Sequence, residues 1–393
     1  MTDAEKDAIR SEWASGNWET PSTLAKAKHL HHSTVLRLVK PKAKINKPKP
    51  ELTLEEQSEL LHFKAKSRSL EQSVSSLLKD RGKQIALFSD LKAAIPAIDP
   101  YPREPIAAKK HASAPIAAVV KISDWQIGEV IDPAQTESFG AFNFGLAEKR
   151  VLRLARKLVD WVTMHRRAGY EVSELHVFSE ADMVSGNIHY ELEVTNEFPA
   201  PIAAIKAGYL FAEFVARLAP HFPKVKLWEV NADNHGRFTR KNQWKQGAQN
   251  NWTRIAHEIA NGRLLTHQNV EAIMSEGPKL LANVLGKKYL LCHGHHIMST
   301  FGIPYYGMSR DKAREALKRM NTDQTFDYMS MGHFHVEGIV ERMILVNGNL
   351  PGTTEMDAAL GRHGPPVQVS FMSHPKHGLF NWTPWNLSEG EAN

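Results

Sequence analysis

Five short clusters of acidic, amide and imidazole side chains stand out between residues 124 and 335. In chain order the clusters are Asp124-Trp-Gln126, Asp182, Asp233-Asn-His235, Cys292-His293-Gly-His295 and Gly332-His333-Phe-His335. Any one of them alone is ordinary, because a loop histidine is more often a surface or structural residue than a ligand. Together they form a mixed set of oxygen and nitrogen donors, which suits manganese, iron or zinc better than an all-oxygen magnesium site. The set therefore predicts divalent metal chemistry.

Each cluster directly follows a short apolar run that has the character of a buried strand. The runs span residues 116–123, 175–178, 225–230, 289–291 and 328–331. From about residue 113 these runs alternate with helix-like segments, which is typical of a layered α/β domain. Loops at the carboxyl ends of such strands converge above a rigid sheet, and ligand sites form there. We therefore expect the five clusters to meet in space.

The order of the clusters resembles the calcineurin-like metallophosphoesterase superfamily. That superfamily carries Asp-x-His, Gly-Asp, Gly-Asn-His, His and Gly-His-x-His blocks, and all five have counterparts here, across roughly residues 113–385. The resemblance implies a two-layer β-sandwich flanked by helices that holds two divalent ions, expected to be manganese, with iron or zinc as alternatives. It assigns Asp124, Gln126, Asp182 and His335 to the first ion, and Asp182, Asn234, His293 and His333 to the second.

The resemblance also implies the reaction. Two neighbouring cations can activate one water while they neutralise phosphate oxygens, so a metal-activated hydroxide would attack phosphorus. His235, next to the implied ligand Asn234, would serve the leaving group as a general acid or stabilise the transition state. The alternative for His235 is a residue that only orients a ligand. The sequence thus predicts a hydrolase of phosphate esters.

Three departures from the superfamily pattern bear on the site. Gln126 replaces the usual histidine, so an amide oxygen stands in for an imidazole nitrogen. Ala181 and Asp233 stand where glycine is usual. Glycine is favoured where the backbone takes unusual angles or approaches another group closely. Alanine should be tolerated there, whereas Asp233 either changes the site or points away from it.

The loop that follows His235 combines basic and aromatic residues. Gly236-Arg237 stands where many relatives carry an acidic residue, and this run, like loops 184–189 and 346–352, resembles the phage- and prophage-borne branch, related to DNA-repair nucleases. Basic groups bind phosphates, and aromatic rings stack on bases. The predicted substrate-binding residues are His189, Arg237, Arg240 and Lys241, with Phe238 and Trp244 interleaved. The alternatives are a solvated basic loop with two core aromatics and, for His189, a hydrogen-bonded loop histidine.

Residues 1–40 are predicted to form three short helices with helix-turn-helix spacing. Thr20-Pro21 is a helix cap followed by a favoured first-turn proline. The unit resembles the helix-turn-helix units of resolvases and transposases, whose third helix enters the major groove, and residues 1–50 carry ten Lys/Arg against five Asp/Glu. The predicted DNA-binding residues are Ser33, Thr34, Arg37 and Lys40. An ordinary three-helix packing unit is the alternative.

The remaining segments are expected to connect these two parts. Residues 41–52 form a Lys/Pro-rich linker that cannot build a packed core, and residues 53–112 form a helical connector. Within the connector, an amphipathic helix at 54–78 would pack either on a partner subunit, giving a homo-oligomer, or on the catalytic domain. The catalytic domain is predicted at 113–385, with a tail at 386–393.

Composition narrows the setting of the protein. The 393 residues contain a single cysteine, Cys292, so no internal disulfide can form. No apolar run approaches the roughly 20 residues that a bilayer crossing needs, and the N-terminus lacks the basic start and apolar stretch of a secretion signal. We therefore expect a cytoplasmic protein, in the bacterial host of a phage or prophage, without a membrane partner.

The leading interpretation is a two-metal phosphodiesterase that cleaves DNA. The metal clusters support the reaction, and the basic loop together with the N-terminal unit supports the substrate. A phosphatase or nucleotide phosphodiesterase for small substrates would share the same centre. A DNA-binding regulator that has lost activity is the non-catalytic alternative, which the departures at Gln126, Ala181 and Asp233 permit.

Overall fold

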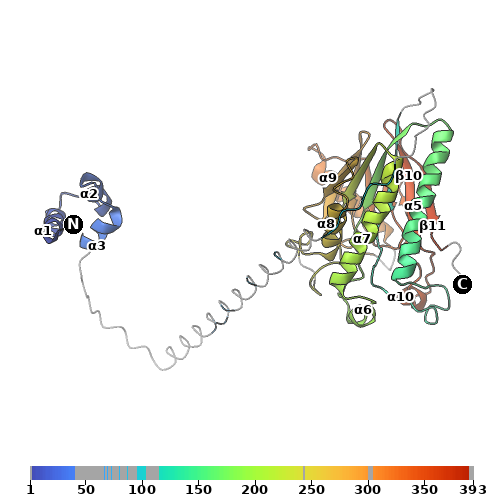
Figure 1. Ribbon diagram of the computed structural model, residues 1–393, viewed down its shortest axis with the longest axis horizontal. Helices are drawn as coiled ribbons and strands as arrows, with labels where there is room; N and C mark the ends of the chain where they lie inside the picture. The colour runs from blue at the N-terminus through green and yellow to red at the C-terminus, as the bar shows by residue number, and fades with distance from the viewer. Residues whose placement is uncertain are drawn as a thin grey trace. The chain divides into compact units, whose positions relative to one another are not determined.

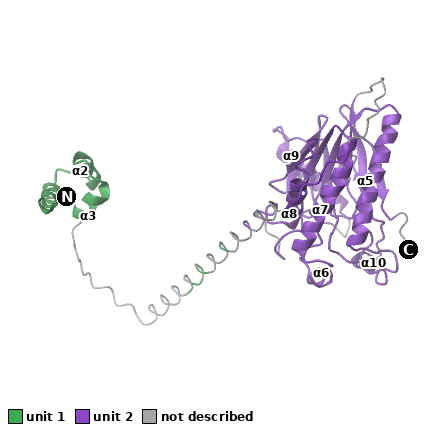
Figure 2. Cartoon of the chain, viewed as in Figure 1, with its two compact units in different colours: residues 1–83 green, residues 84–393 purple. Residues whose placement is uncertain are grey.

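Two compact units divide the chain, residues 1–83 and residues 84–393 (Figure 2). The predicted linker 41–52 lies outside the described residues, as do most of the predicted connector and residues 389–393. The computed structural model describes residues 2–39, 95–102, 115–241, 244–299 and 304–388, and single helical positions at 66, 69, 72, 79 and 86.

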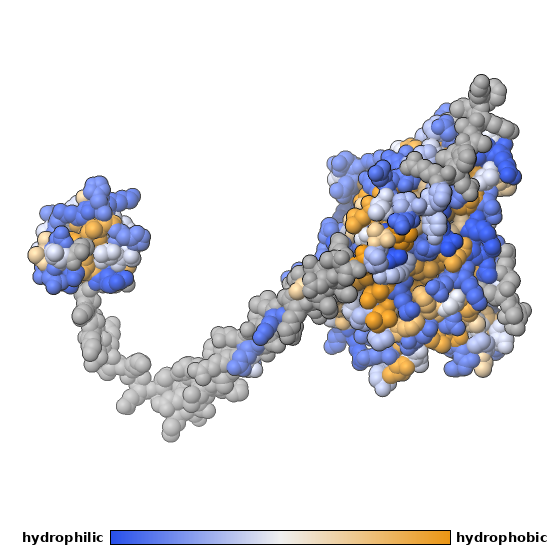
Figure 3. All heavy atoms as spheres, viewed as in Figure 1, coloured by the Kyte–Doolittle hydropathy of each residue, from blue (hydrophilic) through white to orange (hydrophobic). Residues whose placement is uncertain are grey.

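The smaller unit contains the three short helices that the sequence predicts, α1 (Asp3–Ala14), α2 (Pro21–Ala27) and α3 (His32–Val39) (Figure 1). The side chains of Thr2 and Thr20 accept hydrogen bonds from the first turns of α1 and α2, which satisfies donors that a helix start leaves free. Figure 3 shows hydrophilic residues over most of the visible surface of this unit. Its buried core consists of Ile9, Leu24, Ala25, Val35 and Val39.

The predicted DNA-binding residues lie on or next to α3. Ser33 and Arg37 are exposed, and Thr34 is half-buried. Lys40 lies outside the described residues. The role of these side chains in DNA binding stays a prediction.

The larger unit is built around two sheets. The first has the strand order β11-β10-β1-β2-β3-β4, in which β1 to β4 are parallel, β10 is antiparallel to β1 and β11 is antiparallel to β10. The second has the order β5-β6-β7-β9-β8, in which β6, β7 and β9 are parallel. The strands are β1 (Ile116–Ile122), β2 (Val172–Ser179), β3 (Lys224–Glu229), β4 (Val270–Met274), β5 (Lys279–Val284), β6 (Lys287–Cys292), β7 (Tyr328–Met331), β8 (Gly338–Val340), β9 (Ile344–Val346), β10 (Val367–His374) and β11 (Gly378–Asn386).

Helices lie outside the sheets, and the long helices α5 and α7 run side by side along the six-stranded sheet (Figure 1). Among the described residues, no helix is long and apolar enough to cross a membrane. The helices of this unit are α5 (Phe144–Arg167), α6 (Tyr190–Thr195), α7 (Ala200–Leu218), the 3-10 helix η1 (Ala219–His221), α8 (Trp252–Arg263), α9 (Tyr305–Arg319) and α10 (Glu355–Ala359).

Strand β1 lies at the centre of the layers, because both of its faces are buried. Ala118 and Val120 pack in a cluster with side chains of α5, α7 and α8. Ala117 and Val119 belong instead to a cluster that includes Tyr289 of the five-stranded sheet. Since alternate residues of a strand point to opposite faces, the layers run from helices to the six-stranded sheet and then to the five-stranded sheet. The predicted α/β fold, a two-layer β-sandwich flanked by helices, is confirmed.

Residues 95–102 pack on the larger unit, ahead of the expected start of the catalytic domain at residue 113. The backbone N–H of Ile98 donates to the carbonyl of Arg263 at 2.9 Å, and the hydroxyl of Thr266 donates to the carbonyl of Ile98 at 2.7 Å. The Tyr101 hydroxyl donates to Glu213 at 2.9 Å. This segment therefore anchors the N-terminal side of the unit to α7 and to the end of α8.

Candidate metal centre

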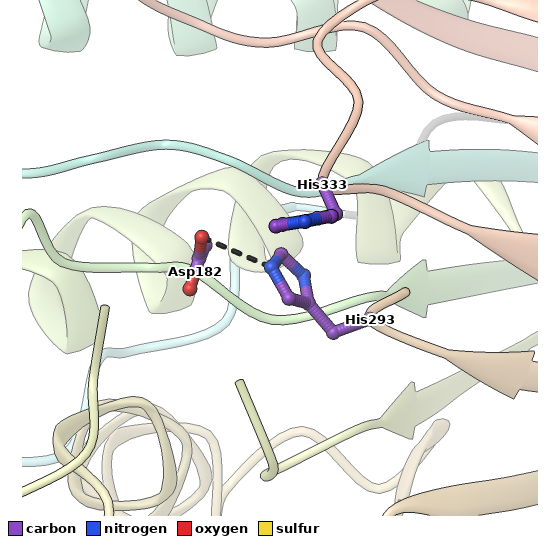
Figure 4. A group of neighbouring side chains, drawn as sticks. All are labelled: Asp182, His293 and His333. Atoms are coloured by element: carbon purple, nitrogen blue, oxygen red, sulfur yellow. Dashed lines mark ion pairs between the residues drawn. The ribbon is translucent and has the colours of Figure 1, made fainter. Parts of the chain in front are cut away.

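The five clusters follow the carboxyl ends of strands from both sheets. In the six-stranded sheet, β1 leads to Asp124 and Gln126, β2 leads to Asp182, and β3 leads to Asn234 and His235. In the five-stranded sheet, β6 leads to His293, and β7 leads to His333 and His335. Ligand atoms of Asp182, His293 and His333 lie within 4.8 Å of one another, and Figure 4 shows the Asp182 carboxylate beside the His293 ring.

His293 faces two oxygens with one nitrogen. Its Nε2 lies 3.0 Å from Oδ2 of Asp182 and 3.0 Å from Oδ1 of Asn234. Its Nδ1 lies 2.9 Å from the carbonyl oxygen of Glu180, which can only accept, so Nδ1 carries a proton. In a neutral imidazole the Nε2 lone pair would then point at oxygen lone pairs. The arrangement is satisfied by a second proton on His293 or by a cation that the three atoms share.

Asp124 joins the two sheets at the other side of the centre. Its carboxylate accepts the backbone N–H of His333, at 3.2 Å to Oδ1 and 3.0 Å to Oδ2. Nε2 of His335 lies 3.4 Å from Oδ1 of Asp124. The carboxylate is completely buried, so its charge needs such partners.

Gln126 supports the presence of a cation most directly. Its side chain is 2% exposed, and neither its amide oxygen nor its amide nitrogen has a hydrogen-bond partner among the described residues. Oδ2 of Asp182 has the ion pair with Nε2 of His293 at 3.0 Å as its printed partner. Leaving a buried polar group unpaired costs about 1–3 kcal/mol. The unpartnered amide oxygen of Gln126, together with the group of Asp182, His293 and His333, fits a divalent cation.

Strained backbone is concentrated at the centre. A positive φ is uncommon for residues other than glycine, and each such residue costs on the order of 1 kcal/mol or more. Ala181 has a φ of 72°, a conformation that glycine adopts more readily than alanine. The predicted ligands with positive φ are Asp124 (52°), Gln126 (50°), Asp182 (50°), His333 (72°) and His335 (57°). Such clustering is typical of functional sites.

Two glycines allow loops of the centre to approach one another. A Cβ on Gly332 would lie 2.4 Å from Oδ2 of Asp124, and a Cβ on Gly186 would lie 2.0 Å from the carbonyl oxygen of His235. Neither position has room for a side chain. The glycine before His333 in the fifth cluster is therefore required by its contact with the carboxylate of the first cluster.

The charges of the centre act strongly on one another. Burial alone would lower the pKa of His293, but the carboxylates of Asp182, Asp124 and Asp233 raise it to about 10. Burial, together with the neighbouring charge of His293, lowers the pKa of His333 to about 2. The neighbouring carboxylates thus favour the charged form of His293, whereas burial favours the neutral form of His333.

His235 and His189 both line the cavity in front of the ligands. The cavity has a volume of about 980 Å³, and its walls include Asp182, Asn234 and His333. The backbone N–H of His235 donates to Oδ1 of Asp182 at 3.2 Å, and its Nδ1 donates to the carbonyl of Ser185 at 2.8 Å. Nε2 of His235 is therefore the nitrogen left to act on a substrate.

The other predicted substrate-binding residues lie apart from this cavity, and none of them is among its described lining residues. Arg237 donates to the carbonyls of Thr239 and Arg240 at 2.9 and 2.8 Å, so its guanidinium holds its own loop. Arg240 pairs with Glu193, and Lys241 is exposed.

The aromatic residues of the same loop divide between two environments. Phe238 packs on Trp252, with ring centroids 4.6 Å apart. Trp244 is 82% exposed. Only Trp244 is therefore free to stack on a ligand.

A buried ion pair next to the predicted ligands was not predicted from the sequence. Nζ of Lys121 lies 3.4 Å from Oε2 of Glu180, and both side chains are fully buried. Lys121 also donates to the carbonyls of Leu345 and Met331, at 2.7 and 3.3 Å, and thereby joins β1 to the five-stranded sheet. Burial raises the pKa of Glu180 to about 7, against the opposing effect of Lys121. A lysine within an otherwise apolar strand was the available signal.

The fold and the site together define an α/β sandwich with a candidate metal centre. No protein-family model and no curated protein matches the chain. A conserved uncharacterised protein from Streptococcus pneumoniae, described as a predicted phosphoesterase, is 10% identical, with a TM-score of 0.24, over 45% of this chain and 90% of its own.

Two further solved structures are similar at the same distance. Vps29 from Entamoeba histolytica, complexed with zinc, is 11% identical, with a TM-score of 0.24, over 69% of this chain and 99% of its own. The sulfate thiohydrolase SoxB from Thermus thermophilus, in complex with glycerol, is 10% identical, with a TM-score of 0.28, over 73% of this chain and 57% of its own. Similarities with TM-scores this low do not indicate the function of this chain.

Proposed function

We propose that this chain is a metal-dependent phosphoesterase of the calcineurin-like type. One observation carries the proposal, namely the convergence of Asp182, Asn234 and His293 at about 3 Å in a pattern that only a proton or a cation satisfies. The unpartnered amide oxygen of Gln126 supports a cation over a proton, because a proton on His293 would leave that oxygen without a partner.

The ligands divide between two positions that share Asp182. Asp124, Gln126, Asp182 and His335 would hold one cation, and Asp182, Asn234, His293 and His333 the other, with manganese as the proposed ion. When bound, two such cations activate water and offset the charge of a phosphate. His235 lines the same cavity, and its Nε2 would give a proton to the leaving oxygen. His189, on the cavity wall, would contact the ester.

The proposed substrate is DNA, which makes the protein a nuclease. The exposed Trp244 and the basic Lys241 lie on the loop that follows His235, and aromatic and basic groups of this kind bind single strands. The small unit offers Ser33, Thr34 and Arg37 on α3, with Lys40 directly after it.

Hydrolysis assays test the reaction and the substrate separately. Full-length protein is incubated with manganese and either bis-p-nitrophenyl phosphate or labelled single- and double-stranded DNA. We expect turnover of both. Hydrolysis of the small diester without cleavage of DNA would contradict the nuclease proposal alone. No hydrolysis of any ester, with fewer than two manganese ions bound per chain and with DNA affinity intact, would favour the inactive regulator.

DNA binding by the small unit is tested with a variant that lacks residues 1–40. Each lost phosphate contact should reduce the slope of log affinity against log salt by roughly 0.9 for double-stranded DNA. We expect weaker binding and a shallower slope. Unchanged binding would contradict the role proposed for α3.

A small-substrate phosphatase or nucleotide phosphodiesterase is the second candidate. It is favoured by the position of Arg237, Arg240 and Lys241, which lie outside the described lining of the cavity that holds the ligands. A comparison of p-nitrophenyl phosphate with bis-p-nitrophenyl phosphate and thymidine 5′-p-nitrophenyl phosphate distinguishes monoesterase from diesterase activity.

A further inference from the structure

Asp233 is a buried carboxylate beside the proposed ligand Asn234. Its side chain is 5% exposed, and its two oxygens accept four hydrogen bonds. Oδ1 accepts from the backbone N–H of Gly236 at 2.7 Å and from Nδ2 of Asn251 at 2.9 Å. Oδ2 accepts from the backbone N–H of Asp182 at 2.9 Å and from the hydroxyl of Thr253 at 2.6 Å. The carboxylate therefore points away from the proposed cations.

The four donors come from three separate segments. Asp182 follows β2, Gly236 ends the turn that carries Asn234, and the remaining two donors belong to the start of α8. Asn251 caps α8 by accepting the backbone N–H of Thr253 at 2.8 Å. The Thr253 hydroxyl in turn accepts the N–H of Met183 at 3.2 Å, so it must donate its own proton to Asp233. The start of a packed helix thus holds the backbone of the proposed bridging ligand.

Only a carboxylate matches this environment. An asparagine at position 233 has one acceptor oxygen and one NH₂ group. If the oxygen stays with Gly236 and Asn251, the NH₂ group meets the N–H of Asp182, and two donors face each other. An alanine would leave all four donors unpaired.

Gly236 complements Asp233. A Cβ at position 236 would lie 2.1 Å from Oδ1 of Asn251 and 2.8 Å from Oδ1 of Asp233. The chain therefore reads Asp-Asn-His-Gly where the superfamily pattern has glycine first and, in many relatives, an acidic residue last. The acidic residue and the glycine have exchanged places around Asn234 and His235. The buried Asp233 accepts the backbone N–H of Gly236, and a side chain at position 236 would collide with Asp233.

We propose that Asp233 is a positioning residue of the metal centre, which holds Asp182 at its left-handed φ of 50° and the Asn234–His235 turn in reach of the cations. The inference rests on the proposed function. Removing the hydrogen-bond partner that orients a metal ligand typically weakens metal affinity by roughly 10- to 100-fold. Asp233 therefore acts through Asp182, without contact to substrate.

The test compares manganese binding by wild-type protein and Asp233→Asn, using calorimetric titration of metal-free full-length chains whose folding is checked by circular dichroism. We expect two ions per wild-type chain and an affinity at least roughly tenfold weaker in the variant. The matched control is Ser179→Ala, which removes an equally buried hydrogen bond, to His257 at 2.7 Å, at the end of β2. It should lower thermal stability and leave manganese affinity within about twofold, because Ser179 contacts no proposed ligand.

Each outcome decides between the two claims. Absence of metal binding in the wild-type protein would refute the proposed function and, with it, the role of Asp233. Normal binding by the wild type and equal binding by Asp233→Asn would refute the positioning role alone and leave a structural one. If Asp233→Asn does not fold, Gly236→Ala replaces it, since the added Cβ displaces Asp233 without removing its charge. Unchanged affinity in that variant would overturn the inference equally.

Discussion

The two sheets of the larger unit contribute different chemistry to one centre. The six-stranded sheet supplies the oxygen donors, Asp124, Gln126, Asp182 and Asn234, whereas the five-stranded sheet supplies the imidazoles, His293, His333 and His335. The contacts between the two sets, such as Asp182 with His293, cross from one sheet to the other. Neither sheet alone offers the whole proposed ligand set, so the proposed metal binding would depend on how the two sheets pack.

The packing between the sheets is itself partly polar. Phe178, Tyr289 and Phe371 form an aromatic cluster between them. Below the centre, the buried Lys121 reaches across from β1 to backbone carbonyls of β7 and β9. Close-packed aromatic rings and a hydrogen-bonded lysine resist small shifts of one sheet against the other. They thereby hold the six-stranded sheet, which carries the oxygen donors (the oxygen side), in a fixed position relative to the five-stranded sheet, which carries the imidazoles (the imidazole side).

The largest effect is expected at Asp182, the residue of the oxygen side that is proposed to contact both cations. Asp182→Asn removes the charge that the two proposed cations would share, so kcat/KM for bis-p-nitrophenyl phosphate should fall by roughly a thousandfold, or about 4 kcal/mol. The exposed Asp160 on α5 provides a matched control, because Asp160→Asn makes the same chemical change away from the centre. Full activity in Asp182→Asn would show that the assignment of the centre is wrong.

Removal of one imidazole should cost less, since each histidine serves a single position. His293→Asn deletes the nitrogen that lies 3.0 Å from Asp182 and Asn234. We expect hydrolysis to fall by roughly a hundredfold and one manganese ion per chain to be lost. His377→Asn, at an exposed turn, is the control. Retention of two ions at unchanged affinity in His293→Asn would contradict the division of ligands between the sheets.

Some strands of the two sheets could be predicted from the sequence, whereas the strand order could not. The strands before the ligands were predictable, because an apolar run followed by a polar cluster is a local signal; the run 116–123 became β1. The strand order was not predictable, since β10 pairs with β1 although the two strands lie far apart in the sequence, with Ala117 opposite Ser373. Strands such as β10 and β11 carry no cluster and were missed.

Within the site, the structure brings together Asp182, His293 and His333 from three of the predicted clusters, whereas the backbone conformation of these loops was not predicted. No local rule predicts a left-handed φ at Asp124 or Gln126, since both residues prefer other conformations. The orientation of Asp233 was left open because its partners Asn251 and Thr253 lie 18 and 20 residues further along the chain. Such pairings become visible only after β3 and α8 are placed.

Gln126→His tests the comparison by adding an imidazole to the oxygen side. Histidine tolerates the left-handed φ of 50° better than most residues, and its nitrogen is a stronger ligand than an amide oxygen for manganese or zinc. We expect the weaker of the two cations to bind roughly tenfold more tightly, measured by calorimetric titration. Gln135→His, in an exposed loop, should leave binding unchanged. Unaltered binding in Gln126→His would show that this side chain does not face the cations.

The smallest expected effect is a pH dependence of stability caused by Glu229. This residue ends β3 of the six-stranded sheet and lies outside the candidate metal centre. Burial raises its pKa to about 8, above the roughly 4.3 of an unfolded chain. The folded state therefore binds the extra proton, and the stability it contributes is full at low pH and is lost as pH rises towards 8. Between pH 6.5 and 7.5 the free energy of unfolding should fall by about 1 kcal/mol more in the wild type than in Glu229→Gln. Urea denaturation of both proteins measures this difference, and Glu271→Gln on the neighbouring β4, which is exposed, should follow the wild type. Parallel curves for wild type and Glu229→Gln would mean that Glu229 is ionised in the folded protein and that the oxygen side is more negative than burial implies.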